Sequence, residues 1–340
     1  MSENPAQMVK QEETRAAVSA PPSIAKYRIL FIRFIPVIVL LINLALHSFL
    51  PNKQVSNVTN TYTGVLIAVI IFYIILACAS MRNQSLGEAM SYKVPLLAVL
   101  FSFFGIWDLA TLKLKLLPLP YFPGPDKVLY AFVQDWPLLL KCTAYSLRLL
   151  FAGYAIGALL GLVTGTLMGW SQRWNYWIGP LLKIIGPIPA TAWIPIALVA
   201  FPTSFLASVF LIALAVWFPV TVMTSSGIAN VRNAFFEVAK TLGGNQKYLI
   251  FKVAVPASMP MIFVGLFMGM GTSFLTLIVA EMLGVKAGLG WYINWAQGWA
   301  EYAKVYTSLI VIAVMFSSII SLLFKTRDRL LIWQKGLIKW

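Results

Sequence analysis

Few side chains in this sequence are of the types that carry out chemistry, and the two most informative are single charges inside apolar runs. The 340 residues include 11 acidic residues, two cysteines and one histidine. Glu281 and Arg148 each stand near one end of a long apolar stretch. Charges at membrane depth are costly and are usually paired, cavity-facing or functional. The two could pair at an outer gate, Arg148 could meet an anionic substrate, or both could simply reach the lipid headgroups.

Catalytic and metal chemistry find little support in the remaining residues. No group of Cys, His, Asp and Glu residues shows the spacing of metal ligands. The lone histidine, His47, stands at an expected helix end, where a histidine is usually structural. The phosphate-binding pattern G-x-x-x-x-G-K-[S/T] is absent from the sequence. We therefore expect no catalytic residue, no metal and no cofactor on this chain. A membrane-embedded enzyme would need a cluster of such groups within its spans.

The elements that position these residues are long apolar segments. Hydrophobic residues make up 60% of the chain and charged residues 11%, against about 45–50% and about 25% in soluble domains. About 20 apolar residues in a helix cross the hydrocarbon layer. The runs are continuous rather than alternating, which favours helices over a barrel. The eight predicted spans are 29–50, 63–80, 93–113, 143–170, 176–201, 205–225, 259–280 and 305–324.

The net charge of +15 is explained by membrane topology, because cytoplasmic loops carry excess Lys and Arg. With the N-terminus inside, 18 of the 26 basic residues fall on the cytoplasmic side. We therefore expect both termini in the cytoplasm and infer no nucleic-acid partner. Residues 1–25 are expected to be disordered, and a cleavable signal peptide is not expected because a long polar tail precedes the first apolar run.

Two segments suggest how the helices pack. Glycines at every fourth position, 153, 157, 161, 165 and 169, form a ridge that lets another helix backbone approach closely. The span 176–201 is rich in proline, including Pro187 and Pro189. It could be an interrupted helix that lines the transport path or an ordinary kinked helix. The proline-rich stretch 117–125 should end the third span, and 126–141 should form a short surface helix before the fourth.

A loop of about 33 residues between the sixth and seventh spans is predicted to form a helix–turn–helix elbow on the inner membrane surface. Val231, Phe235, Ala239 and Leu242 would share one apolar face of its first helix. Gly243-Gly244 would stop that helix. A second short helix would follow and end at Pro256. Such an elbow buries little by itself, so its apolar face suits a groove on a partner protein.

The segment Glu237-Val238-Ala239-Lys240-Thr241-Leu242-Gly243, followed by Val255-Pro256, resembles the EAA motif of binding-protein-dependent ABC importer permeases. Val238 departs from the motif, since Ala is usual there. The likeness covers roughly residues 94–340 and is closest to the nitrate, sulfonate, taurine and bicarbonate group. Supporting stretches are Gly186-Pro187-Ile188-Pro189, Ala280-Glu281-Met282-Leu283-Gly284 and Gly288-Leu289-Gly290.

The resemblance implies an all-α polytopic bundle with a six-helix importer core at 93–340, preceded by an additional hairpin at 26–92. It implies coupling through Glu237, Ala239, Leu242, Gly243 and Pro256 to a separate cytoplasmic ATPase that binds ATP and Mg²⁺. A periplasmic or lipid-anchored substrate-binding protein, a permease homodimer, membrane lipid and the bacterial inner membrane are also implied. The substrate would be a small anion or zwitterion. The alternative is an ion-coupled secondary transporter or channel, which would favour several intramembrane acids or an inverted repeat.

One further motif is aromatic. Trp291, Trp295 and Trp299 stand four residues apart and would share a face of a short outer helix. With Tyr292, Tyr302 and Tyr306 they suit the membrane interface, where aromatic rings lie at headgroup level. Trp291 could instead join Arg148, Pro187, Pro189 and Glu281 along the translocation path or gate.

Overall fold

The computed structural model describes residues 22–54 and 60–332. All regular secondary structure in these ranges is helical, as predicted, and it includes two π-helical segments and one 3-10 turn. The elements are α2 (Pro22–Phe49), α3 (Thr61–Arg82), α4 (Gln84–Asp108), η1 (Leu109–Lys113), α5 (Pro125–Trp170), α6 (Gln172–Ile185), η2 (Ala190–Trp193), α7 (Ile194–Ala200), α8 (Ser204–Ala229), α9 (Asn233–Thr241), α10 (Gln246–Tyr248), η3 (Leu249–Ala254), α11 (Val255–Gly284), α12 (Leu289–Gly298) and α13 (Tyr302–Leu330).

Each predicted span falls on described helices, but α4 begins nine residues before the predicted 93 and α5 begins 18 residues before the predicted 143. Seven are long and apolar enough to cross a membrane, and the bent pair formed by α6 and α7 makes an eighth candidate. Most of the expected disordered tail, residues 1–21, lies outside the described residues, and residues 22–25 belong to α2. The division of the chain at residues 92 and 93 stays a prediction.

The predicted surface helix at 126–141 is wrong as a separate element. It is the first part of α5, which runs unbroken for 46 residues from Pro125 to Trp170. Pro137 lies inside the helix and removes one backbone hydrogen bond, but no glycine or turn residue follows to end it. At about 1.5 Å per residue, α5 is roughly 70 Å long, well over the hydrocarbon thickness of about 30 Å.

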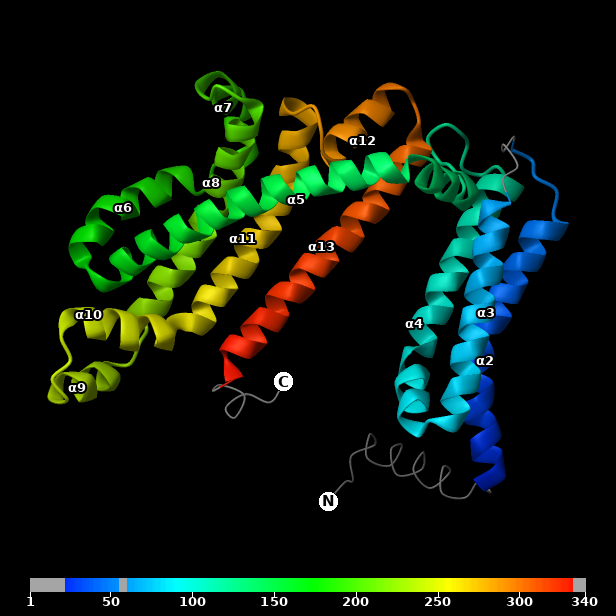
Figure 1. Cartoon of the computed structure of the whole chain (residues 1–340), viewed down its shortest axis with the longest axis horizontal. Coiled ribbons are helices and arrows are strands. Elements are labelled where there is room, and N and C mark those ends of the chain that lie inside the picture. The colour runs from blue at the N-terminus through cyan, green and yellow to red at the C-terminus, as the bar shows by residue number, and fades with distance from the viewer. Residues whose placement is uncertain (1–21, 55–59, 333–340) are drawn as a thin grey trace, which may run out of the picture. The chain divides into compact units, whose positions relative to one another are not determined.

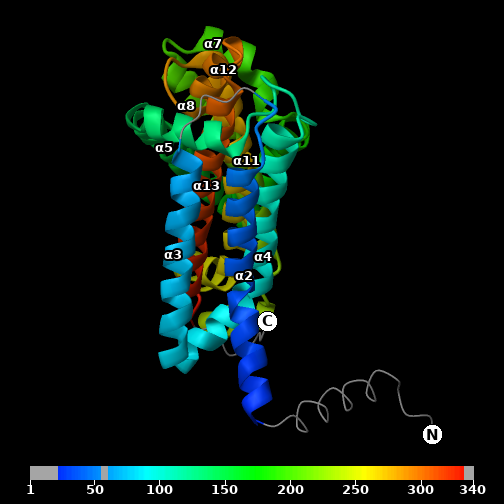
Figure 2. The same ribbon diagram turned by 90° about the vertical axis from the view of Figure 1, so that its right-hand side faces the viewer.

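The chain divides into two compact units between Gln134 and Asp135. In the first unit α2, α3 and α4 lie side by side (Figure 2). Asn43 of α2 donates to the Phe101 carbonyl at 2.7 Å, next to Gly105, where a β-carbon would collide with the Asn43 amide. A polar side chain facing a glycine in this way joins α2 to α4 within the apolar span.

One end of the first unit contains a buried charge cluster. Lys113, only 3% exposed, donates to the carbonyls of His47 and Leu50 at 2.5 and 2.6 Å and to Asn52 Oδ1 at 2.7 Å. The His47 ring lies 3.0 Å from the Asp108 carboxylate. The ammonium thus satisfies carbonyls at the C-terminal end of α2, where a positive charge is favoured.

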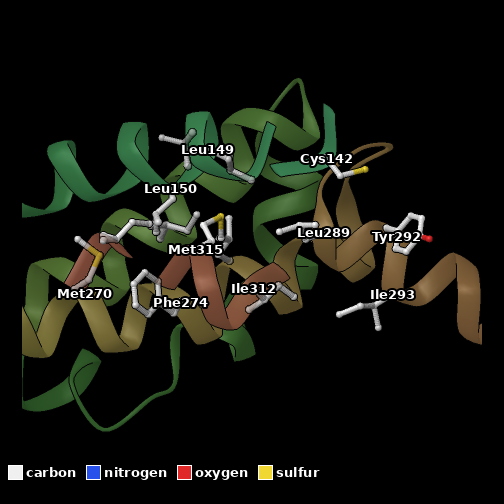
Figure 3. Packing of buried hydrophobic residues seen from close by; sticks show 14 of the residues in the cluster. Cys142, Leu149, Leu150, Met270, Phe274, Leu289, Tyr292, Ile293, Ile312 and Met315 are labelled. Atoms are coloured by element: carbon white, nitrogen blue, oxygen red, sulfur yellow. The ribbon is translucent and has the colours of Figure 1, made fainter. Parts of the chain in front are cut away.

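The second unit is built around α8, which is the most buried of the candidate spans. The five glycines of α5 lie against α8, and a β-carbon on any of them would come within 3 Å of α8 atoms. Gly265 and Gly269 of α11 approach α8 as well, at Val220 and Val216. The predicted packing role of the glycine ridge is therefore confirmed. Figure 3 shows the adjoining core, in which Leu149 and Leu150 of α5 lie near Met270 and Phe274 of α11 and Met315 of α13.

The proline-rich span is interrupted rather than gently kinked. α6 and the following η2–α7 segment meet at 84° across a break that contains Pro187 and Pro189. Gly186 lies at this break, and a β-carbon there would meet the Phe218 ring at 2.1 Å. Proline removes donors, and glycine permits the close approach, so the sequence at 186–189 accounts for the bend.

Candidate functional site

The predicted elbow is present at one end of the second unit. Figure 1 places α9 and α10 at one end of α8 and α11, and α7 and α12 at the opposite end. α9 is a helix of nine residues, Asn233–Thr241, and α10 follows after a short turn. The two candidate regions of this chain, the elbow and the surroundings of Glu281, therefore lie at opposite ends of the same helices.

The faces of α9 differ from the predicted ones. Ala239 is buried, and Phe236 packs edge-on against Trp170 of α5 with ring centroids 5.6 Å apart. Phe235, Val238 and Leu242 are instead exposed, by 51%, 60% and 83%. The predicted face was wrong because it grouped Ala239 with Phe235 and Leu242. The exposed apolar face is the set Phe235, Val238 and Leu242, which we call the α9 outer face.

The helix ends at Gly243 as predicted. Gly243 has φ +83°, and its amide donates to the Lys240 carbonyl at 3.0 Å. The Gly244 amide donates to the Ala239 carbonyl at 2.8 Å. This is a left-handed C-terminal cap, which glycine adopts without the clash that a β-carbon would meet. The cap leaves Leu242, the last residue before it, at the tip of the elbow.

Pro256 does not end the second helix, contrary to the prediction. The chain stays helical from Gln246 to Gly284. Leu249–Ala254 forms a π-helical segment, and Pro256 lies in the first turn of α11 directly after it. Pro256 has no amide to bond to the preceding turn, and it follows directly on the π-helical segment, where the hydrogen-bond spacing of the helix changes. The second half of the elbow is therefore continuous with a membrane-crossing helix.

Glu237 is exposed on α9 and borders a pocket of about 220 Å³. The pocket also takes in Lys240, Phe236 and, from η3, Leu249. Glu237, Ala239, Leu242 and Gly243 thus belong to one small structure, in which Ala239 faces inward and the others are accessible.

At the opposite end, Glu281 is fully buried. Its Oε1 accepts a hydrogen bond from the Ser146 hydroxyl at 2.7 Å, and its Oε2 accepts one from the Gly290 amide at 2.8 Å. The Ser146 oxygen in turn accepts the Leu289 amide at 2.9 Å. Sequence reasoning missed Ser146 because an isolated serine within an apolar span carries no pattern.

Of the alternatives that the sequence left open for Arg148 and Glu281, the ion pair does not form in the structure. Arg148 is exposed, and its guanidinium lies 5.1 Å from the centroid of the Phe205 ring. The side chains of α5 at positions 146 and 148 point in different directions around the helix, so Ser146 reaches Glu281 and Arg148 does not. Arg148 is left accessible above an aromatic ring of α8, an arrangement that suits a cation–π contact.

α12 presents its aromatic residues differently from the prediction. Trp291 and Trp295 share a face, with centroids 6.4 Å apart and rings nearly parallel. Trp299 follows the helix end and is 71% exposed. Tyr292, expected at the interface, is fully buried and donates to Asp135 Oδ2 at 2.7 Å. Burial and this hydrogen bond raise the pKa of Tyr292 above its ordinary value, which keeps the phenol protonated as a donor.

Lys304 completes this second network. Its ammonium lies 3.4 Å from Asp135 and 2.7 Å from Glu301, and 4.9 Å from the centre of the Trp295 ring. Asp135 of α5, Tyr292 of α12 and Lys304 of α13 are thereby joined. The described residues contain no group of three His, Cys, Asp or Glu that could hold a metal ion.

Comparison with known proteins supplies the family. Residues 157–330, just over half of the chain, match the family described as "Binding-protein-dependent transport system inner membrane component". The match includes the elbow and Glu281 and leaves out α2, α3 and α4.

Individual relatives have similar descriptions. The chain is 32% identical to a bicarbonate transport system permease protein, CmpB, of Synechococcus elongatus, over 61% of this chain and 73% of that protein. It is 34% identical to a putative aliphatic sulfonates transport permease protein, SsuC, of Bacillus subtilis, over 54% and 67%. It is 27% identical to a nitrate import permease protein, NrtB, of Leptolyngbya laminosa, over 72% and 88%.

A crystal structure of an amino acid ABC transporter aligns with 61% of this chain and 98% of that chain, at 21% identity and a TM-score of 0.48. The family match and the identity to CmpB are sufficient on their own to assign the chain. The protein therefore belongs to the binding-protein-dependent transport system inner membrane components, the multi-pass permease subunits of ABC importers, in which a separate ATPase hydrolyses ATP.

Proposed function

We propose that this permease carries a small anion or zwitterion, such as nitrate, a sulfonate, taurine or bicarbonate, and that its elbow receives the force of ATP hydrolysis. The similarity to bicarbonate, sulfonate and nitrate permeases supports this substrate class. The observation that carries the coupling role is the α9 outer face, in which Phe235, Val238 and Leu242 are all more than half exposed.

The coupling proposal rests on the shape of the elbow. An apolar helix face suits a groove in a partner protein. The Gly243 cap holds Leu242 at the tip, and Glu237 is accessible beside it. Ala239 anchors α9 from its buried side. Because the second half of the elbow continues into α11 past Pro256, displacement of the elbow would be transmitted directly along a membrane-crossing helix.

The translocation path would run near the opposite end of the second unit. Arg148 is accessible and would attract an anionic substrate. Pro187 and Pro189 interrupt a membrane-crossing segment, as in transporters whose broken helices line the binding site. Trp291 and the buried Glu281 would belong to the outer end of this path, with Glu281 holding its structure rather than meeting the substrate.

The assembly would contain two copies of this permease, two cytoplasmic ATPase subunits and a periplasmic or lipid-anchored binding protein. One elbow serves one ATPase, so a homodimer is the simplest arrangement. Both termini would lie in the cytoplasm, which the distribution of basic residues supports. ATP and Mg²⁺ would be bound by the ATPase, with no cofactor and no nucleic acid on this chain, and lipid would surround the spans.

Copurification of the ATPase with tagged permease tests the coupling proposal. Leu242→Asp places a charge on the α9 outer face, and we expect it to abolish copurification and ATP-driven uptake while the permease still accumulates in the membrane. Leu330→Asp is the matched control, because Leu330 is a leucine exposed by 53% at the end of α13. Normal ATPase recovery with Leu242→Asp would refute the elbow as the coupling site.

The substrate class is tested on the binding protein that supplies this permease. Calorimetric titration with nitrate, bicarbonate, taurine and an alkyl sulfonate should give tight binding for one of them. Uptake by the full assembly should then fall with Arg148→Gln and be retained by Arg148→Lys. Tight binding only to a cation or an uncharged solute would contradict the proposal.

A further inference from the structure

We propose that Glu281 and Ser146 form an internal latch that fixes the start of α12 to α5 and α11, so that these three elements move as one body during transport. A buried carboxylate within a membrane-crossing helix normally marks a substrate or ion path. Here the Glu281 carboxylate is bonded by Ser146 of α5 and by the start of α12. The inference depends on these contacts and not on the substrate.

The latch is a short closed chain of hydrogen bonds. The Glu281 carboxylate accepts from the Ser146 hydroxyl and from the Gly290 amide, and the Ser146 oxygen accepts from the Leu289 amide, at 2.7, 2.8 and 2.9 Å. Glu281 and Ser146 are both fully buried. Because both side chains are shielded from solvent, loss of either would leave buried amides without acceptors, which is costly.

The amides concerned are the first two of α12. The opening amides of a helix have no partner within the helix and carry partial positive charge. In transporters, such helix starts can bind the anionic group of a substrate. In α12 this position is already occupied by the protein's own carboxylate. We infer that α12 is a fixed wall of the outer end and that its N-terminus does not bind substrate anions.

Glycine geometry supports a specific fit. Gly288 has φ +119°, and a β-carbon there would lie 2.4 Å from the Glu281 carboxylate. A β-carbon on Gly290 would lie 2.5 Å from the Ile278 carbonyl and 2.8 Å from the β-carbon of Glu281. Because Gly288 and Gly290 have no side chain, the Glu281 carboxylate can approach the backbone at both positions. The motif Gly288-Leu289-Gly290 is accounted for by this approach.

A second anchor holds α12 from its other side. The Tyr292 hydroxyl bonds to Asp135 of α5, and Lys304 of α13 lies against both Asp135 and the Trp295 ring. The α12 residues Leu289, Tyr292 and Ala296 are fully buried. A helix anchored at its start and along its buried face is poorly suited to swing as a gate.

Hydrogen exchange of the full-length permease in its importer complex, in lipid nanodiscs, tests the latch. Glu281→Gln keeps the size of the side chain but places an amide donor where a second acceptor is needed. We expect exchange in residues 286–298 to rise about tenfold or more, with α8 and α13 unchanged. Ser146→Ala should give a smaller rise in the same segment. Ser273→Ala is the matched control, because Ser273 is a buried serine of α11 that bonds only within its own helix.

The double variant separates a latch from general stability. If Glu281 and Ser146 act together, the double variant Glu281→Gln/Ser146→Ala should raise hydrogen exchange in residues 286–298 little more than Glu281→Gln does by itself. Fully additive increases would contradict the latch. A rise spread evenly over all helices would mean a purely global effect on folding, and unchanged exchange at 286–298 would mean that α12 is held by other contacts. Either result would overturn the proposal.

Discussion

Gly157 of α5 and Ala213 of α8 lie so close together that a β-carbon on Gly157 would be 2.4 Å from the Ala213 carbonyl oxygen. The same relationship repeats along α5 at each of its ridge glycines. Gly265 of α11 also approaches the backbone of α8, at Pro219 and Val220. Because lipid is as apolar as the side chains, close packing of backbones replaces the hydrophobic effect as the force that joins these helices.

Gly157→Ala should therefore destabilise the second unit. The added methyl group has no room without separating α5 from α8, and overpacking of this kind costs about 1–3 kcal/mol. We expect a lower thermal unfolding temperature of the purified permease in detergent. Gly271→Ala is the control, since Gly271 lies in α11 with no atom within 4 Å of its added β-carbon. Equal unfolding temperatures for the two variants would contradict the close packing.

The cost of replacing Gly243 should depend on how readily the new residue adopts a positive φ. Its added β-carbon would meet nothing within 4 Å, so only the backbone conformation imposes a cost, roughly 1–2 kcal/mol for an ordinary residue. We expect ATPase copurification to decrease in the order Gly, Asn, Ala, Val at this position. Gly298→Ala, with equally open space, should have no effect. If Gly243→Val behaved like wild type, the cap would be irrelevant to coupling.

Tyr292→Phe should weaken the attachment of α12 to α5. The phenol bonds to a carboxylate, and hydrogen bonds to charged groups contribute about 1.5–3 kcal/mol. Thermal unfolding measures the loss, with Tyr248→Phe as the control because Tyr248 is 51% exposed on the elbow. No difference between the two variants would show that the Asp135 contact contributes nothing.

The same tyrosine predicts a pH dependence. Burial and Asp135 raise the pKa of Tyr292 above the ordinary 10.0, so the unfolded chain loses this proton at a lower pH than the folded chain does. The stabilisation is then complete below about pH 10 and is lost as pH rises further. Stability measured from pH 8 to 11 should fall less steeply in Tyr292→Phe than in wild type. Parallel curves would contradict the shift.

Lys113→Met should loosen the first unit. Three oxygens would lose their common donor, including the carbonyls of His47 and Leu50, and an acceptor left without a partner away from water costs about 1–3 kcal/mol. Limited proteolysis should then cleave the 50–54 connection faster. Lys53→Met on the same connection is the control, because that side chain is exposed. Equal cleavage rates in the two variants would show that Lys113 does not hold this segment.

The sequence alone determined the class of protein and most of its helices. Continuous apolar runs require lipid, and they located all eight spans, although α4 and α5 begin well before the predicted residues. The elbow, its glycine stop and the family resemblance followed from local patterns, because helix periodicity and glycine caps depend on neighbours in the chain. Local rules misjudged the end of the surface helix 126–141, which continues into α5, and they misjudged Pro256, which lies within a continuous helix.

Only the tertiary structure decided which side chains meet. Ser146 and Glu281 are separated by 135 positions in the sequence, and no local pattern predicts that they bond. The same holds for Tyr292 with Asp135, and it explains why Arg148 does not reach Glu281. The sequence showed that Arg148 and Glu281 are charged and lie at similar depths in the membrane. The direction in which each side chain points around its helix depends on how the helices pack. In this permease the sequence therefore located the elbow and the surroundings of Glu281, and helix packing determined which side chains bond to one another there.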